Sequence, residues 1–195
     1  MRSPRSLLVS LLTACLLAAA PAGCGLFGEP KADVDNPVHF TDDGFAFDHP
    51  GNWETQVERE DIDEVTLTTV YVQSKYGNAM VIVQQFTPAV PLNYDQLAAD
   101  FMLGIEEGTP DIASVEELDG GDRPVIHREL LGAEREGRKV RYAPSVLGES
   151  VAHTVEIYFV ELEARTLVIY TQVPDEDRGK AERGFDLVLD SLVET

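Results

Sequence analysis

Segments that are apolar on both faces of an extended chain constrain the fold of this sequence most. In the stretch 154–162 each face carries three apolar side chains, namely Val155, Ile157 and Phe159 on one face and Tyr158, Val160 and Leu162 on the other. Successive side chains of a strand point to opposite faces. A strand of this kind therefore needs cover on each side, or a central position in its sheet.

Six further segments are rich in the β-branched and aromatic residues that favour strands. They are Gly44–Asp48, Val65–Ser74, Ala79–Phe86, Val125–Leu131, Arg138–Leu147 and Thr166–Val173. The connections Lys75–Asn78 and Glu163–Arg165 are short enough to be hairpin turns. The sequence thus predicts a largely antiparallel sheet.

Two segments follow the helical period instead. Their apolar stripes are Tyr94, Leu97, Ala98, Phe101 and Ile105 in Asn93–Gly108, and Ala181, Phe185, Val188, Leu189 and Leu192 in Asp175–Leu192. Asn93 and Gln96 resemble a capping pair at the start of the first helix. Gly179 and Gly184 each cost about 1 kcal/mol relative to alanine in the second, so packing must hold that helix. Strands, a helix, more strands and a terminal helix indicate an α+β fold, an antiparallel β-sheet flanked by helices.

The first 23 residues have the layout of an export signal. Arg2 and Arg5 form a basic start, the run from Leu7 to Ala20 is almost wholly apolar, and Ala22-Gly23-Cys24 closes it. The apolar run is too short to cross about 30 Å of hydrocarbon. Small residues directly before a cysteine are typical of bacterial lipoprotein signals. We expect a lipoprotein signal peptide over 1–23 and lipidation of Cys24.

Two alternatives remain open at this end of the chain. Cys15 follows Leu12-Thr13-Ala14, which also suits a lipidation site but leaves a short apolar core. An ordinary secretory signal would be cut after Ala20 or Ala22. No cysteine follows Cys24, so the exported part has no disulfide framework and no Cys-x-x-Cys metal site.

Residues 24–37 are polar and contain glycine and proline without an apolar period, so we expect a flexible tether there. Residues 38–195 have the length of one domain, enough to bury a full core without disulfides. The net charge of −20 argues against a nucleic-acid partner, because such a surface repels phosphates. We expect the lipid to make the membrane contact, since the sequence has no polybasic run.

Several residues carry reactive groups without a catalytic spacing. The histidines His39, His49, His127 and His153 lie on separate segments, and Ser145 and Ser150 are in no nucleophile motif. The acidic turn of Glu116, Glu117, Asp119 and Asp122 lacks the ligand spacing of an EF-hand. Trp53 is a candidate for the floor of a ligand groove, although a core position is more usual. We expect no catalytic, cofactor-binding or metal site.

The segment Gly44-Phe45-Ala46-Phe47-Asp48-His49-Pro50 followed by Trp53 resembles the opening of PsbP-like domains, which include lipoproteins of the LpqN and DcrB types. The close, Val188-Leu189-Asp190-Ser191-Leu192, is similar as well. His49 stands where these domains have an aromatic residue. The resemblance implies an antiparallel sheet between helices and a non-catalytic accessory role, and no metal ligands of the family can be matched here.

These inferences lead to two functional hypotheses. In the first, the chain is a membrane-anchored extracytoplasmic lipoprotein that is not an enzyme and docks envelope partners. In the second, it binds a small apolar molecule or a lipid in a pocket between the sheet and the helix at Asn93–Gly108. The volume of that pocket distinguishes the two, since carriers need several hundred Å³.

Overall fold

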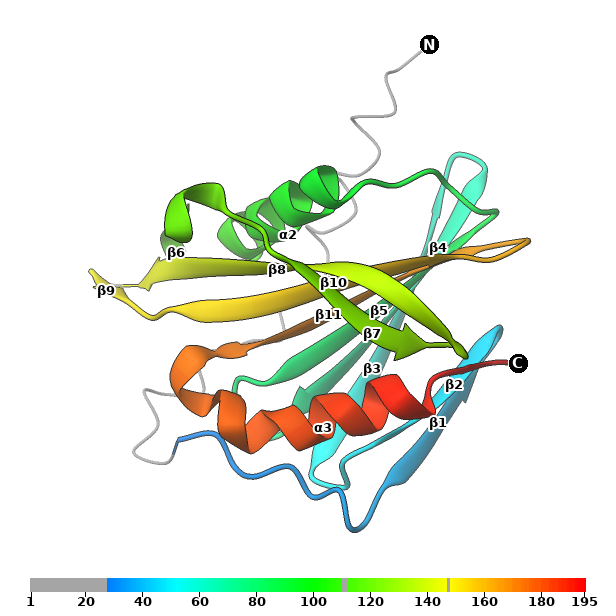
Figure 1. Ribbon diagram of the computed structural model, residues 1–195, viewed down its shortest axis with the longest axis horizontal. Helices are drawn as coiled ribbons and strands as arrows, with labels where there is room; N and C mark the ends of the chain where they lie inside the picture. The colour runs from blue at the N-terminus through cyan, green and yellow to red at the C-terminus, as the bar shows by residue number, and fades with distance from the viewer. Residues whose placement is uncertain (1–27, 110–111, 147) are drawn as a thin grey trace.

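An antiparallel sheet crosses the whole molecule (Figure 1). The computed structural model describes residues 28–109, 112–146 and 148–195. Within these residues the sheet has the order β3 (Trp53–Ile62), β4 (Val65–Ser74), β5 (Met80–Thr87), β11 (Thr166–Pro174), β10 (His153–Glu161), β8 (Ala133–Val146) and β6 (Ile112–Glu117). Strands β7 (Val125–Leu130) and β9 (Glu149–Ser150) also pair with β8. A smaller sheet is formed by β1 (Val38–Asp42), β2 (Phe45–His49) and β12 (Val193–Glu194).

Helices cover both faces of this sheet, as the apolar strands require. The helix α2 (Tyr94–Gly108) packs on one face, where Val155 and Ile157 of β10 belong to its core. The helix α3 (Arg178–Ser191) and the smaller sheet cover the other face, where Tyr158 lies. The predicted α+β fold with an antiparallel sheet flanked by helices is confirmed.

The predicted elements agree closely with the observed ones where apolar periodicity is strong. Strand β4 has the predicted bounds, β5 and β10 differ by one residue at either end, and both hairpins are antiparallel pairs. Asn93 caps α2 by accepting a hydrogen bond from the backbone N–H of Gln96 at 2.9 Å. The helix α3 begins three residues later than predicted, after a short 3-10 turn over Asp175–Asp177.

Strands β1, β3 and β6 and the two-residue strands β9 and β12 are not among the predicted segments, and β8 starts five residues earlier than predicted. Strand β3 shows the reason, because most of its residues are polar and exposed. It lies at the edge of the sheet and pairs with β4 alone. An edge strand needs little apolar periodicity, so the sequence pattern does not reveal it.

The segment 28–37 corrects the prediction of a flexible tether over 24–37. Ala32 is buried and its N–H donates to the carbonyl of Lys180 at 3.1 Å. Glu29 is also buried, and its carboxylate accepts from the N–H of Asn78 and of Ala79. The domain therefore begins before residue 38. Cys24, Cys15 and the predicted signal peptide lie outside the described residues.

Candidate functional site

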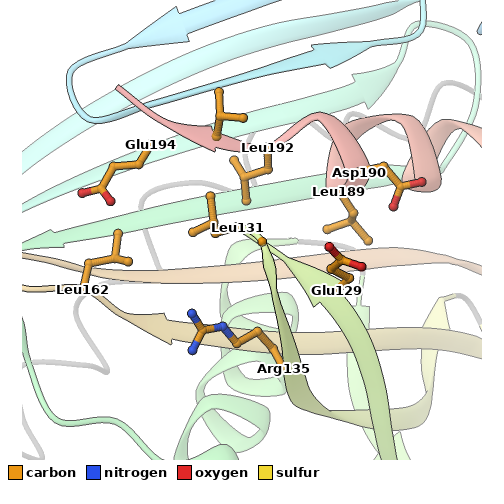
Figure 2. A pocket seen from close by; sticks show the side chains of 10 residues that line it. Glu129, Leu131, Arg135, Leu162, Leu189, Asp190, Leu192 and Glu194 are labelled. Atoms are coloured by element: carbon orange, nitrogen blue, oxygen red, sulfur yellow. The ribbon is translucent and has the colours of Figure 1, made fainter.

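An open groove of about 660 Å³ lies between the C-terminal end of α3 and the turn that joins β7 to β8 (Figure 2). We call it the α3 groove. Its lining consists of Glu129, Leu131, Gly132, Arg135, Leu162, Leu189, Asp190, Leu192, Val193 and Glu194. Four leucines and Val193 form the apolar part, and Leu189 and Leu192 are also members of the core. Gly132 and four charged residues form the remainder.

The turn beside the groove holds a leucine in a conformation that leucine rarely adopts. Strands β7 and β8 pair directly up to Leu130 and Ala133, so Leu131 and Gly132 alone make the turn. Both have positive φ, 53° and 73°, as a tight hairpin turn requires. Glycine adopts this conformation freely, but leucine does so at a cost of about 1–2 kcal/mol. Packing against the core holds Leu131 there, and its side chain lines the groove.

An arginine ties this hairpin to α3. Arg128 of β7 donates to Asp186 at 2.9 Å and to Asp190 at 2.6 Å. Burial lowers the pKa of Arg128. The hydrogen bonds to both carboxylates raise this pKa by more than burial lowers it, so it lies above its ordinary value. The guanidinium stays charged and fixes the wall of the groove.

The charges around the groove are mostly negative. Three carboxylates, those of Glu129, Asp190 and Glu194, line it together with one cation, Arg135. Arg135 lies directly across from Arg128 in the β7–β8 pair. Its Nε is buried and has no hydrogen-bond partner among the described residues. A leucine floor with carboxylates around it suits an apolar and basic segment of a partner.

The pocket that we expected between the sheet and α2 is filled by side chains. The ring of Phe101 stacks on the ring of Tyr170, with 5.3 Å between the ring centroids. It lies nearly perpendicular to the ring of Tyr142, with 5.6 Å between the centroids. Leu97 and Ala98 are buried in the same layer. Burial also raises the pKa of Asp100, whose Oδ1 accepts from Gln96 at 2.7 Å. The space needed by an apolar ligand at this position is therefore occupied by the core.

The four histidines lie apart. His39 of β1 contacts Asp48 at 2.8 Å, and His49 is buried beside Phe47. His127 lies on β7, and His153 of β10 stacks on Tyr142 at 5.3 Å. Burial lowers the pKa of both His49 and His153. Across the described ranges, no group of three or more metal-binding side chains is positioned to hold an ion.

The other candidates have structural partners. Ser145 and Ser150 are opposite each other in the β8–β9 pair. In the acidic turn, Glu117 accepts from Arg123 at 2.6 and 2.9 Å, and Asp119 accepts from Arg141 at 3.0 Å. These carboxylates hold the turn to its neighbours.

Trp53 is a core residue. It is 2% exposed and its ring meets the edge of Phe185 in α3 at 5.7 Å. A Cβ on Gly184 would lie 2.8 Å from this ring, so the glycine that weakens α3 makes room for the tryptophan.

Sequence reasoning missed the α3 groove. Its lining comes from two hairpin turns and the end of a helix, which are distant in sequence. The one local signal is Leu130-Leu131-Gly132, an apolar pair at a turn, where polar residues are usual.

No family model and no curated protein sequence matches this chain. Solved structures do. The solution structure of cyanobacterial PsbP (CyanoP) from Synechocystis sp. PCC 6803 matches with a TM-score of 0.50 and 14% identity, over 90% of this chain and 99% of the other. The crystal structure of LpqN, involved in cell envelope biogenesis of Mycobacterium tuberculosis, matches with a TM-score of 0.36 and 10% identity. This match covers 82% of this chain and 90% of the other. The first likeness concerns the fold, and it confirms the PsbP-like architecture expected from the sequence. No helix among the described residues is long and apolar enough to span a membrane.

Proposed function

We propose that this chain, which has a PsbP-like fold, is a lipid-anchored protein of the cell envelope that docks a partner protein without catalysing a reaction. The observation that carries the proposal is the α3 groove, with its leucine floor and its three carboxylates. Apolar area with a few placed charges is the usual makeup of a recognition surface. The segment it suits best is apolar and carries lysine or arginine.

The location rests on the sequence. The export signal expected over 1–23, followed directly by Cys24, supports a location outside the cytoplasm with a diacylglycerol on the cysteine as the anchor. The absence of any later cysteine agrees with this role, because Cys24 then serves as an acyl acceptor alone.

The geometry of the groove favours docking over chemistry. No histidine, serine or cysteine is among its lining residues, so the groove holds no centre of the serine-histidine or cysteine-histidine type. Asp190 pairs with Arg128, and Glu194 lies 4.0 Å from Arg165. Glu129 forms no salt bridge with another described residue, and it is placed to attract a basic group of a partner. This electrostatic attraction gives specificity and a fast association rate.

Binding of a small apolar molecule remains the second candidate. The groove volume of about 660 Å³ falls within the range of ligand pockets, and leucines line part of it. The open form and the charges argue for a protein segment. Native mass spectrometry of the protein from its own membranes separates the two, since a carrier retains a small molecule that denaturation releases.

Photo-crosslinking in intact cells tests the docking role. A photoreactive amino acid at Leu162, in the groove, is expected to yield one discrete crosslinked protein. The same amino acid at Val151, which is 45% exposed and outside the groove lining, is expected to yield none. Crosslinking at both positions or at neither would contradict the proposal.

A charge reversal refines the test. Glu194→Lys places a cation in the groove and is expected to reduce the crosslink at Leu162. Glu149→Lys makes the same change on exposed β9, outside the lining, and is expected to leave the crosslink unchanged. Equal effects of the two reversals would mean that net charge, rather than the groove, governs binding.

A further inference from the structure

The start of the described chain lies in a local concentration of lysines. The sequence contains four lysines, at positions 31, 75, 139 and 180. The structure brings three of them to one end of the molecule. Lys31 follows Glu29, whose carboxylate binds the β4–β5 turn, and Lys75 begins that turn. The backbone carbonyl of Lys180 accepts a hydrogen bond from the backbone N–H of Ala32.

An exposed aromatic residue accompanies these lysines. Tyr76 is at the tip of the β4–β5 turn and is 81% exposed. Lys31, Lys75 and Lys180 are exposed as well. We call these four residues the anchor-side patch. Tyrosine and lysine together are typical of protein surfaces at the headgroup level of a membrane.

Acidic groups lie at this end too, and Asp35 and Glu176 are exposed there. Glu29 is buried and accepts two backbone hydrogen bonds. Asp177 accepts from Lys180 at 2.9 Å, and Asp33 accepts from Asn36 at 3.0 Å. Lys31 and Lys75 form no salt bridge with another described residue. Lys180 is paired with Asp177, so Lys31 and Lys75 are the cations that the patch offers to headgroups on a protein whose net charge is −20.

The distance to the proposed lipid is short. Gly28 follows Cys24 by four residues, which span at most about 14 Å when fully extended. Because residues from Glu29 onward are fixed to the domain, the lipid cannot lie far from the patch.

From these observations we propose that the anchor-side patch rests on the lipid headgroups and orients the domain on the membrane. The proposal relies on the lipidation of Cys24 proposed above. Anionic headgroups repel most of this acidic surface and attract the lysines. Lys180 lies near the start of α3, whereas Leu189 and Asp190 of the α3 groove lie near its C-terminal end. Figure 1 shows these two ends of the helix on opposite sides of the molecule. The groove thereby faces away from the membrane, where a partner can reach it.

Depth-dependent quenching tests the orientation. The full acylated chain is placed in vesicles of phosphatidylcholine that contain about 30% phosphatidylglycerol. The anionic lipid gives the vesicle surface a negative potential. A fluorophore is attached to a single cysteine, introduced as Tyr76→Cys or as Val193→Cys in the groove. Headgroup quenchers are expected to quench the label at position 76 strongly and the label at 193 weakly. Equal quenching of the two would overturn the proposal.

Lysine variants test the cause. Lys31→Gln and Lys75→Gln are each expected to weaken the preference for the bound orientation about fivefold, and neutral vesicles are expected to do the same. Lys139→Gln removes the one lysine outside the patch, on β8, and is expected to leave the quenching unchanged. Unchanged quenching in the first two variants would overturn the role of the patch.

The intact mass of the same preparation separates this proposal from the one on which it rests. A chain without an acyl group would overturn both the lipid anchor and the orientation. An acylated chain with equal quenching at the two positions would overturn the orientation alone.

Discussion

The carboxylate of Glu29 accepts a hydrogen bond from the backbone N–H of Ala79, fifty residues further along the chain, at 3.0 Å. The same carboxylate also accepts from Asn78. A Cβ on Gly77 would lie 2.0 Å from this carboxylate, so the β4–β5 turn needs glycine at that position. One buried acidic side chain thus fixes the start of the domain to a hairpin turn.

Loss of this side chain is expected to destabilise the protein. Glu29→Ala leaves two N–H groups without their acceptor, which costs about 1–3 kcal/mol of unfolding free energy. Asp35→Ala, an exposed change in the same segment, is expected to stay within about 0.5 kcal/mol. Urea denaturation of both variants measures the difference. Equal stabilities would show that the segment contributes nothing to the domain.

The two glycines of α3 are expected to respond oppositely to alanine. At Gly179 a Cβ meets no atom within 4 Å, so Gly179→Ala is expected to stabilise the protein by up to about 1 kcal/mol. At Gly184 a Cβ would lie 2.8 Å from Trp53 and 2.9 Å from Ala32. Gly184→Ala is expected to destabilise by about 1–3 kcal/mol through overpacking. Thermal unfolding of the pair measures this, and a gain at both positions would contradict the packing.

A substitution at Leu131 distinguishes the backbone strain of the turn from binding of the partner. Leu131→Asn places a residue that tolerates positive φ in the turn and relieves about 1 kcal/mol of strain, which partly offsets the lost packing. We expect the fold to persist while the crosslink from Leu162 to the partner weakens. A Leu131→Asn variant that crosslinks like the native protein would show that the partner does not use the leucine floor.

The stability of the protein is expected to fall in mild acid because of His153. Burial lowers the pKa of this histidine in the folded state, against the hydrogen bond to Val151 and the charges of Asp175 and Glu176, which raise it. The unfolded chain takes up a proton near the ordinary value of 6.5. The contribution of His153 to the free energy of unfolding is therefore constant above that pH. It becomes destabilising as the pH falls below that value.

Denaturation of the native protein and of His153→Phe at pH 7.5 and 5.5, chosen about one unit either side of the ordinary histidine pKa, measures this effect. Phenylalanine keeps the stacking on Tyr142 and removes the titration. The variant is expected to lose less stability between the two pH values than the native protein. Equal losses would mean that the half-buried ring of His153 does not contribute to the pH dependence.

The sequence predicts the central part of this fold well, because strands such as β4 and β10 are apolar on both faces and α2 has a clear stripe and a cap at Asn93. It does not predict β3, whose polar residues suit an edge strand. Nor does it predict the α3 groove or the anchor-side patch. Lys31, Lys75 and Lys180 are distant in sequence, and only the tertiary fold brings them to one end of the molecule. The segment 28–37 has a tether-like composition, but its contacts depend on Glu29 and Ala32, two residues with distant partners.

The intact mass of the protein extracted from the membranes of its own organism tests the central claim most directly. We expect a chain that begins at Cys24 and carries a diacylglycerol on its thiol. A chain that begins after Ala20 or Ala22, or one that carries a free thiol at Cys24, would contradict it.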